Sequence, residues 1–295
     1  MNGETATSHK PLLSGPMIRS VLYVPADRPK MLLKAAQRHA DLVLVDLEDA
    51  VAVGSKELAR REAQRAIPSL KRDGACVGVR INSHPDHLAS DLNALAGLDI
   101  DTIVVPKADL RLIERISATR AVAGTGLTAL VESGRGLLDA PSMAAHERVI
   151  RLMAGEADMG ADLGMSVPPE HPAWLASRSM LVWASAAAGI EGPIGPVYTN
   201  LDMSTLDQLR RSTQELADMG FAGRSAIHPA HVRIINETFT PGAVELEEAR
   251  RMVEAYDRAI ASGRGIIVDE NGRMIDEAVV RRSRQIVAAY PDPSS

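Results

Sequence analysis

The stretch Leu42–Val51 reads LVLVDLEDAV and places three carboxylates directly after a run of apolar residues. An apolar run this short predicts a strand buried on both faces, so Asp46, Glu48 and Asp49 would lie where the strand emerges. Acids clustered at the exit of a strand form a candidate site. The alternative is that Asp46 or Asp49 only caps a following helix, since a carboxylate accepts hydrogen bonds from the free N–H groups of a first turn.

Short apolar runs of this kind recur along the chain. They are SVLYV (20–24), LVLVD (42–46), VGVRI (77–81), TIVVP (102–106), LTALVE (127–132), VIRLMAG (149–155), PIGPVY (193–198) and SAIH (225–228). Helical spacing occurs between them, at Pro29–His39, Ser55–Lys71, Pro85–Leu95, Leu110–Val122, Gly136–His146, Ala173–Ala188 and Ser204–Met219. Strands that alternate with helices predict a parallel sheet, and eight such units predict a closed (β/α)8 barrel, the TIM barrel. The run at 193–198 is the weakest, because the stretch 160–195 is long and punctuated by Gly and Pro and leaves room for an extra helix or loop.

The C-terminal ends of barrel strands are where barrel enzymes have their active sites. The residues at or just after these ends are Asp46, Glu48, Asp49, Arg80, Asn82, Lys107, Glu132, Asp158 and His228. Each one by itself can be a helix cap or a surface charge. Because so many strand ends carry a charge or an imidazole, we expect one functional site at this end of the barrel.

Glu132 and Asp158 are candidate ligands of a metal ion. Two carboxylates on neighbouring strands supply hard oxygen atoms without a full cage, which suits Mg²⁺, an ion that keeps waters and takes other ligands from its substrate. Zinc is disfavoured, because the chain has one cysteine and its eight histidines form neither an HxxxH nor an HxH pair. Arg80 would then grip a carboxylate or carbonyl oxygen through its planar fork.

Composition and charge exclude several classes of protein. Lys and Arg number 33 against 38 Asp and Glu, and two Phe, two Trp and four Tyr are too few to stack bases, so nucleic acid is not an expected partner. The single Cys76 excludes an internal disulfide, reads as a small buried residue and fits a reducing cytoplasm. No apolar run has the length of a membrane span, and residues 1–16 lack a signal peptide's apolar core, so no membrane association is expected.

The expected organisation is a flexible tail at residues 1–16, the barrel at 17–240 and a helical extension at 241–295. After His228 the chain continues through Pro229–Glu237, a helix at Val244–Ser262, the Gly-rich stretch GRGIIVDENGRMID and a last helix to about Tyr290. The extension lies outside the count of eight units and is free to serve as a lid.

Eight motifs, in order, resemble the citrate lyase beta-subunit family, which belongs to the wider HpcH/HpaI aldolase superfamily. They are RSVLYVPADRPKMLLKA (19–35), DLEDAV (46–51), RIN (80–82), VVPKA (104–108), VESGRG (131–136), GEADMGADLG (155–164), GFAGRSAIHP (220–229) and GRMID (272–276). The resemblance implies a (β/α)8 barrel that forms a homo-oligomer, a trimer or hexamer, and that cleaves 3-hydroxyacyl-CoA thioesters with Mg²⁺. Its expected ligands are an acyl-CoA and a small 2-oxo acid.

The resemblance also implies roles for individual residues. The family's metal carboxylates match Glu132 and Asp158, and its substrate-binding arginine matches Arg80. The family's acids after the second strand match Asp46, Glu48 and Asp49, and its lysine after the fourth strand matches Lys107. We expect Glu48 and Asp49 to act in catalysis with Arg80 and Asp276. We expect Asp46, Lys107 and Glu132 to bind the substrate with Arg80. In malyl- and citramalyl-CoA lyases the acid of a similar C-terminal motif serves the neighbouring subunit's site, and it matches Asp276. The alternative is that Asp276 only caps the final helix.

The implied reaction is a retro-Claisen cleavage. The β-hydroxyl loses a proton while the C2–C3 bond breaks, which leaves a 2-oxo acid, pyruvate or glyoxylate, and a thioester enolate. Mg²⁺ would act as a Lewis acid on the hydroxyl and carboxylate, and Arg80 would stabilise the negative charge that develops on oxygen. A carboxylic acid would then protonate the enolate carbon to give acetyl-CoA.

The chain departs from the family pattern at three positions, all of which affect the shape of the pocket and none of which removes a ligand: Ala26, Ala154 and Ala157. Two rival functions stay open, the catalytic beta subunit of a multi-component citrate lyase that acts on a citryl thioester, and a non-catalytic CoA-thioester-binding barrel. Two basic groups can meet CoA phosphates or form solvated helix faces: Arg28, Lys30, Lys34 and Arg38, and Lys56, Arg60 and Arg61.

Overall fold

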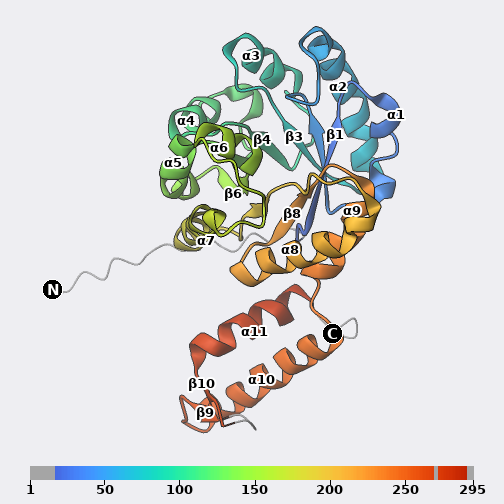
Figure 1. The fold of residues 1–295 in the computed structure, drawn as a ribbon. Helices are drawn as coiled ribbons and strands as arrows, with labels where there is room; N and C mark the ends of the chain where they lie inside the picture. The colour runs from blue at the N-terminus through green and yellow to red at the C-terminus, as the bar shows by residue number, and fades with distance from the viewer. Residues whose placement is uncertain (1–16, 269–271, 291–295) are drawn as a thin grey trace, which may run out of the picture. The chain divides into compact units, whose positions relative to one another are not determined.

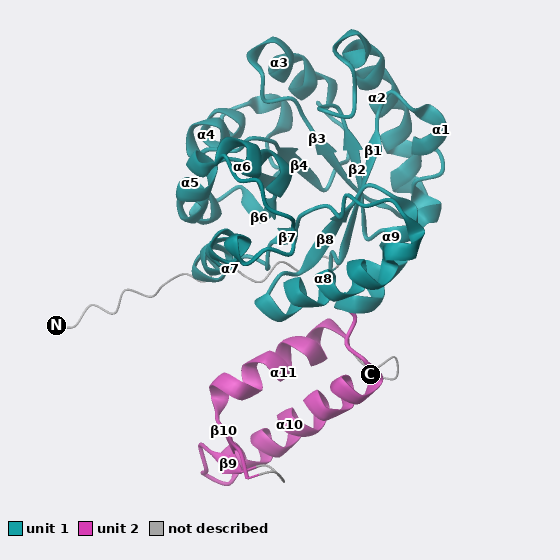
Figure 2. Cartoon of the chain, viewed as in Figure 1, with its two compact units in different colours: residues 1–239 teal, residues 240–295 magenta. Residues whose placement is uncertain are grey.

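The computed structural model describes residues 17–268 and 272–290, so the expected tail at 1–16 lies outside the described residues. The chain divides into two compact units, residues 1–239 and residues 240–295 (Figure 2). Each unit has its own apolar core, as is usual for parts of a chain that pack separately.

Within residues 17–239, eight parallel strands close into a barrel in the order β1 to β8, with helices between them (Figure 1). The strands are β1 (Ser20–Pro25), β2 (Leu42–Asp46), β3 (Cys76–Arg80), β4 (Thr102–Val105), β5 (Gly126–Val131), β6 (Val149–Ala154), β7 (Ile194–Gly195) and β8 (Gly223–Ala226). Because β1 pairs with both β2 and β8, the sheet closes on itself. The predicted TIM barrel is confirmed, and each of the apolar runs overlaps one of its strands.

The strands are buried on both faces, which explains why their sequences are continuously apolar. All five residues of β2 are buried. Val21, Leu44 and Met153 belong to an apolar cluster inside the barrel, where every second residue of a strand points. The residues between them, such as Val43 and Val45, belong to the larger core that the strands share with the helices.

Strand β7 is the shortest of the described barrel strands and covers only part of the predicted run 193–198. Pro193 and Pro196 flank it, and a proline has no N–H to donate to a neighbouring strand. Gly195 allows α8 to lie close, because an added Cβ would come within 2.6 Å of Leu216 Cδ1.

The helices around the barrel are α1 (Pro29–Leu32), α2 (Lys56–Arg72), α3 (Pro85–Ala94), α4 (Leu110–Ser117), α5 (Gly134–Ala145), α6 (Glu156–Asp162), α7 (Leu175–Ala188), α8 (Leu206–Met219) and α9 (Pro229–Phe239). Helix α1 is shorter than predicted, and a 3₁₀ turn at Ala36–Arg38 follows it. Helix α6 lies where the residue spacing predicts no helix. With a 3₁₀ turn at Pro172–Trp174, it occupies part of the long stretch before α7.

The second unit pairs α10 (Ala243–Ala261) with α11 (Glu277–Ala289), and the short strands β9 (Ile267–Val268) and β10 (Met274–Ile275) lie between them in the chain. Tyr256, Ile275 and Val280 form its small core. Asp276 caps α11, since its Oδ1 accepts a hydrogen bond from the backbone N of Val279 at 3.1 Å. The predicted helices are therefore present, and the role of this unit as a lid stays a prediction.

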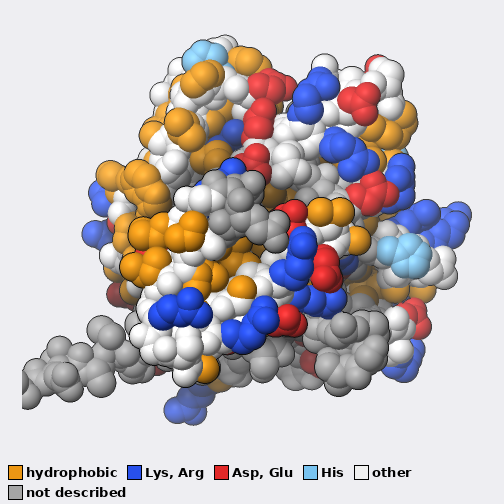
Figure 3. Space-filling model, turned by 90° about the horizontal axis from the view of Figure 1, so that it is seen from below, with side chains coloured by type: hydrophobic (Ala, Val, Ile, Leu, Met, Phe, Trp, Pro, Cys, Tyr) orange, Lys and Arg blue, Asp and Glu red, His pale blue; other side chains and the backbone are white. Residues whose placement is uncertain are grey.

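The surface of the described residues carries charges of both signs. Figure 3 shows acidic and basic side chains mixed with apolar ones on the face that it displays. This mixture agrees with the near balance of 33 basic and 38 acidic residues in the sequence. Among the described helices, none combines the length and the hydropathy that crossing a membrane requires.

Candidate active site

Five of the residues predicted from strand ends lie together at one mouth of the barrel: Asp46, Glu48, Arg80, Lys107 and Glu132. They come from the C-terminal ends of β2, β3, β4 and β5 or the residues just after them. Parallel neighbouring strands in register bring these ends side by side, and Asp46 is the direct partner of Arg80 in the β2–β3 pairing. Hydrogen bonds and ion pairs then link the five side chains.

The Arg80 guanidinium is held by a buried carboxylate. Its Nε and Nη2 donate to the two oxygens of Asp46 at 2.8 and 2.6 Å, and Asp46 is fully buried. The Arg80 guanidinium also lies over the ring of Tyr23, with Cζ 5.0 Å from the ring centroid. The fork that was expected to grip a substrate carboxylate is thus engaged by Asp46, and the Nη1 side of the group is turned toward Glu48.

Asp46 also shapes the turn that follows β2. Its Oδ1 accepts the backbone N–H of Glu48 at 2.9 Å, and its Oδ2 accepts that of Ala50 at 3.3 Å. Asp46 therefore accepts N–H groups of a turn, and not those of a helix as the capping alternative expected, since helix α2 begins only at Lys56. One carboxylate fixes both the loop that carries Glu48 and the cation that Glu48 faces.

Glu48 lies between the two cations of the site. Its Oε2 is 2.8 Å from Nη1 of Arg80, and its Oε1 accepts a hydrogen bond from Nζ of Lys107 at 2.6 Å. Burial raises the pKa of Glu48, while Arg80 and Lys107 oppose that rise. Asp49 is more exposed, with Oδ2 3.8 Å from Nζ of Lys107 and 4.0 Å from Nη1 of Arg80.

The backbone at Lys107 is turned so that its N–H points at Glu132. Its φ is 49°, in the left-handed region that residues other than glycine rarely adopt. The backbone N donates to Oε2 of Glu132 at 2.8 Å, while the side chain of the same lysine reaches Glu48. Backbone strain of this kind is concentrated at functional sites, and here it lets one residue hold two acids.

Glu132 and Asp158, the predicted metal ligands, face the same mouth. Burial raises the pKa of Glu132 to about 7, and the negative charges of Glu48 and Asp158 add to the rise. Asp158 is exposed in the first turn of α6. Gly155, which precedes that helix, leaves room for Glu132, since an added Cβ would overlap the glutamate side chain. Among the described residues, no group of three or more His, Cys, Asp or Glu is arranged to hold a metal ion.

Behind the acids lies a buried polar network that contains Asn82, which the strand-end pattern identifies, and Lys56, Arg60 and Asp91, which it does not identify. Leu47 O accepts hydrogen bonds from Nζ of Lys56 and Nδ2 of Asn82, both at 2.8 Å. Oδ2 of Asp91 accepts both the backbone and the side-chain N–H of Asn82 at 2.7 Å, and its Oδ1 accepts Nε of Arg60 at 2.7 Å. This network fixes the backbone between Asp46 and Glu48 from the outer side.

The sequence contains a signal for one of the missed residues. Tyr23 lies two positions after the inward-facing Val21 in β1. Because successive side chains of a strand point to opposite faces, Tyr23 also points into the barrel, below Arg80. Lys56 and Asp91 have no such signal, because charged residues at helical spacing read as solvated.

The two basic groups considered for CoA phosphates differ in the structure. Lys56 and Arg60 are buried and bonded inward, so they do not face solvent. The group around α1 is exposed and stays available for phosphates: Arg28, Lys30, Lys34 and Arg38. His228 is not drawn into the acid cluster; its Nδ1 accepts the backbone N–H of Ala230 at 3.2 Å at the start of α9. Asp276 belongs to the second unit.

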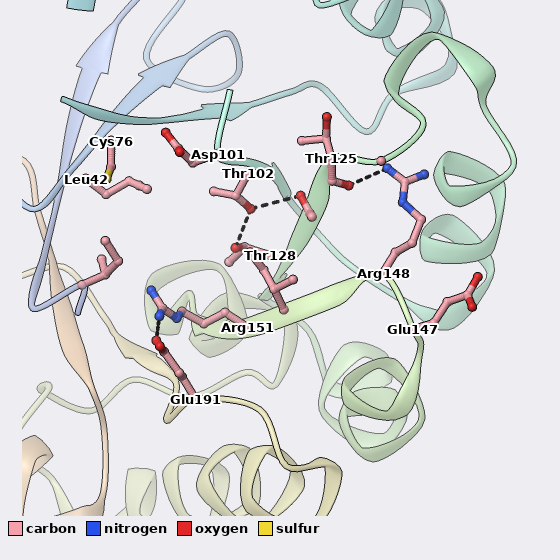
Figure 4. Close-up of a pocket in the computed structure, with 14 residues that line it drawn as sticks. Leu42, Cys76, Asp101, Thr102, Thr125, Thr128, Glu147, Arg148, Arg151 and Glu191 are labelled. Atoms are coloured by element: carbon pink, nitrogen blue, oxygen red, sulfur yellow. Dashed lines mark hydrogen bonds and ion pairs between the residues drawn. The ribbon is translucent and has the colours of Figure 1, made fainter. Parts of the chain in front are cut away.

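Two cavities lie at opposite ends of the strands. One of about 910 Å³ opens beside Glu48 and Lys107, between the loops that follow β2 and β3. The other, of about 530 Å³, lies at the N-terminal ends, where Figure 4 shows Arg151 paired with Glu191 and Thr102 bonded to Thr128. Cys76 lines this second cavity and is only half-buried, and burial raises the pKa of its thiol. The acids at the mouth make the first end the candidate active site.

The buried network predicts a large difference between the two acidic partners of Arg60. Asp91→Ala would remove the buried carboxylate that Arg60 and Asn82 share and should lower the free energy of unfolding by about 3–5 kcal/mol. Glu57→Ala removes an exposed partner, 2.6 Å from Nη1 of the same arginine, and should cost less than about 1 kcal/mol. Urea unfolding at pH 7 measures both, and equal losses would contradict this account.

The raised pKa of Glu132 predicts how stability changes with pH in EDTA. An acid with a folded-state pKa of about 7 and an ordinary value of 4.5 binds more protons folded than unfolded between these values. Stability should therefore fall as pH rises from about 4.5 to about 7, by about 3 kcal/mol. Glu132→Gln should remove most of this fall, and Glu114→Gln, at an exposed position on α4, should keep it. Urea unfolding at several pH values would contradict the assignment if both variants behaved alike.

The chain is similar to known proteins over most of its length. A (3S)-malyl-CoA thioesterase from Cereibacter sphaeroides is 32% identical over 271 residues, which cover 92% of this chain and 93% of that protein. The citrate lyase subunit beta of Escherichia coli K12 is 31% identical over 283 residues, with 92% of each chain covered. Both similarities span the barrel and the C-terminal unit.

Solved structures agree with these relatives. Mycobacterium tuberculosis protein CitE, in complex with magnesium, acetoacetate and coenzyme A, has a TM-score of 0.77 and 29% identity and covers 93% of this chain and 98% of its own. The citrate lyase beta subunit of that organism, complexed with oxaloacetate and magnesium, has a TM-score of 0.66 and 30% identity over 77% of this chain. The family model described as HpcH/HpaI aldolase/citrate lyase matches residues 19–229. With the acids, the arginine and the lysine at one barrel mouth, this chain belongs to the HpcH/HpaI aldolase/citrate lyase family and is a lyase of that family.

Proposed function

We propose that the protein is a Mg²⁺-dependent CoA-ester lyase that cleaves citramalyl-CoA or malyl-CoA to acetyl-CoA and pyruvate or glyoxylate. The observation that carries the proposal is the buried Glu132, whose pKa is raised by burial and in part by the charge of Asp158. The cluster of Arg80, Glu48 and Lys107 lies beside it. This set offers cation ligands and fixed positive charge at one mouth. Relatives whose names include malyl-CoA, citrate lyase and bound coenzyme A support the substrate class.

The residues present fit a magnesium ion. Glu132 and Asp158 supply carboxylate oxygens, and the negative neighbours that help to raise the pKa of Glu132 would also attract a divalent cation. Bound Mg²⁺ would supply Lewis-acid polarisation of the hydroxyl and carboxylate oxygens of the substrate. Magnesium in the structures of CitE supports this choice of ion.

The protein groups divide the remaining work. Arg80, fixed by Asp46, stabilises negative charge that develops on oxygen as the C2–C3 bond breaks, through its Nη atoms and its field. Lys107 is half exposed and can bind the carboxylate of the 2-oxo acid. Glu48 and Asp49 hold the Lys107 side chain in place and can bind nearby water. The electron pair of the broken bond passes to the thioester enolate, which takes up one proton at C2, so the proton lost from the hydroxyl is balanced.

Two other activities on the same scaffold are distinguished by products. Thioester hydrolysis, which the name of the Cereibacter relative suggests, would release free CoA and the intact 3-hydroxy acid. A citrate lyase beta subunit would act on a citryl thioester and give oxaloacetate. A binding barrel would release nothing.

The test is to incubate the purified protein and MgCl₂ with malyl-, citramalyl- and citryl-CoA and to measure acetyl-CoA, free CoA and each oxo acid by mass spectrometry. We expect acetyl-CoA with pyruvate or glyoxylate. Glu132→Ala and Asp158→Ala should each lower kcat by about two orders of magnitude or more. Asp162→Ala, on the same helix and bonded to the backbone of Gly134 instead, is the matched control and should stay near the native value. Free CoA as the main product, or full turnover in EDTA, would contradict the proposal.

We further propose that Asp276 is the acid that serves C2 of the thioester in a neighbouring subunit of a trimer or hexamer. Its capping bond to Val279 does not exclude this, because Asn caps a helix about as well as Asp but cannot donate a carboxyl proton. Asp276→Asn should therefore keep the stability of α11 and lower kcat by about a hundredfold or more.

A mixing experiment tests the assignment to the neighbouring subunit. Asp276→Asn subunits mixed with Glu132→Ala subunits should regain activity, since a mixed interface joins an intact metal site to an intact Asp276. Glu277→Ala, one residue further on, is the control for the single variant. Full activity of Asp276→Asn would make the residue a cap alone. Subunit exchange, seen by mass spectrometry, without recovered activity would exclude action in trans.

A further inference from the structure

Helix α6 needs support from other parts of the protein. It has seven residues, and an isolated helix of that length is unstable in water. Glu156 and Asp158 are two positions apart, so a rotation of about 200° around the helix axis separates their side chains. Glu156 is accordingly buried, and Asp158 is exposed. What holds the buried side of α6 therefore decides where Asp158 points on the other side.

The residue before α6 lies against Glu132. The backbone N of Gly155 donates to Val131 O at 2.9 Å, and Val131 directly precedes Glu132. An added Cβ at Gly155 would overlap Cγ of Glu132, so this close approach requires a glycine. The contact fixes the point at which α6 begins. It does not fix the direction in which the helix runs.

Helix α7 supplies a second attachment. Nε and Nη2 of Arg178 donate to the two oxygens of Glu156 at 2.6 and 2.8 Å. Nη2 also donates to Pro169 O at 2.8 Å, in the segment that links α6 to α7. Both charged side chains are buried. Because the planar fork binds a carboxylate through two parallel bonds, it restricts both the distance and the direction between the two helices.

We propose that Arg178 is a positioning residue of the metal site. By holding Glu156, it sets the direction of α6 and so the separation of the Asp158 and Glu132 carboxylates on the opposite side of the helix. The inference rests on the proposed Mg²⁺-dependent function and extends it to a residue that is not itself a ligand. Outer residues that orient metal ligands contribute about 10–100-fold to metal affinity.

The sign of the effect separates this role from an effect of charge. A positive charge repels a cation, so removal of the charge of Arg178 would by itself tighten cation binding. Arg178→Lys keeps the charge but cannot form the bidentate fork, so positioning predicts weaker cation binding in this variant. The test changes Arg178 and keeps the charge of Glu156, because that charge also acts on the buried Arg224.

A second bidentate pair provides the matched control. Nε and Nη2 of Arg19 donate to the two oxygens of Asp41, both at 2.8 Å. These residues directly precede β1 and β2, so the pair lies at the end of the barrel opposite to Glu132. Arg19→Lys breaks a fork of the same kind and should lower the stability in urea without a change in cation affinity.

The main experiment measures the binding of Mn²⁺, in place of Mg²⁺, to the purified full-length protein without substrate. Electron paramagnetic resonance reports the binding, because the sharp signal of free Mn²⁺ is lost when the ion binds. We expect Arg178→Lys to raise the Kd by about tenfold or more and Arg19→Lys to leave it within about twofold. Glu156→Asp, which keeps the charge on a shorter side chain, should act as Arg178→Lys does and replaces it if that variant does not fold. Native affinity in whichever of these two folds, or an equal loss in Arg19→Lys, would overturn the proposal.

Two ligand variants separate failure of this proposal from failure of the proposed function. If Glu132→Ala and Asp158→Ala lose Mn²⁺ while Arg178→Lys binds it as the native protein does, the ligands stand and the positioning role fails. If Arg178→Lys weakens binding but no thioester is cleaved by the native protein, the positioning role stands and the lyase function fails. Where cleavage occurs, the kcat of Arg178→Lys should return toward the native value as MgCl₂ is raised, and a loss that added MgCl₂ does not relieve would contradict the role.

Discussion

The bidentate ion pair between Asp46 and Arg80 is the interaction on which the barrel mouth depends. A buried charge is costly unless it is paired and its remaining hydrogen-bonding capacity is used, and both conditions hold for Asp46. Besides Arg80, it accepts the backbone N–H groups of Glu48 and Ala50. A single fully buried carboxylate thus sets the turn after β2 and the orientation of the guanidinium at the end of β3.

From Arg80 the charges alternate across the mouth: Glu48 follows it, then Lys107, whose backbone holds Glu132. The acids nevertheless exceed the cations, since Asp49 and Asp158 face the same region. Burial, together with the negative charges of Glu48 and Asp158, is why the pKa of Glu132 rises to about 7. Surplus negative charge around a glutamate whose pKa is raised favours a bound cation, which gives the proposed magnesium ion a physical basis.

The same scaffold carries relatives with different names, a thioesterase and a citrate lyase subunit among them. Fold therefore does not decide the reaction, and the decision falls to the residues around the reacting carbon. A lyase must keep water from the thioester carbonyl, whereas a thioesterase must admit it. The residues around the mouth of the barrel are the part of the described chain in which that difference would be made.

The sequence by itself determined the barrel and most of its strand ends, because strands buried on both faces must be continuously apolar and a parallel closed sheet brings their ends to one mouth. Asp46, Arg80, Lys107 and Glu132 were identifiable on that ground alone. The sequence could not determine the partners of these groups: that the fork of Arg80 engages Asp46, that Lys56 and Arg60 point inward to the network around Asp91, or that Lys107 adopts a left-handed backbone. It also did not reveal helix α6 or the short β7, whose prolines remove ladder donors. Periodicity reports which face of an element is buried, whereas pairing, strain and desolvation depend on distances between residues far apart in the chain, and only the closed tertiary structure sets those distances.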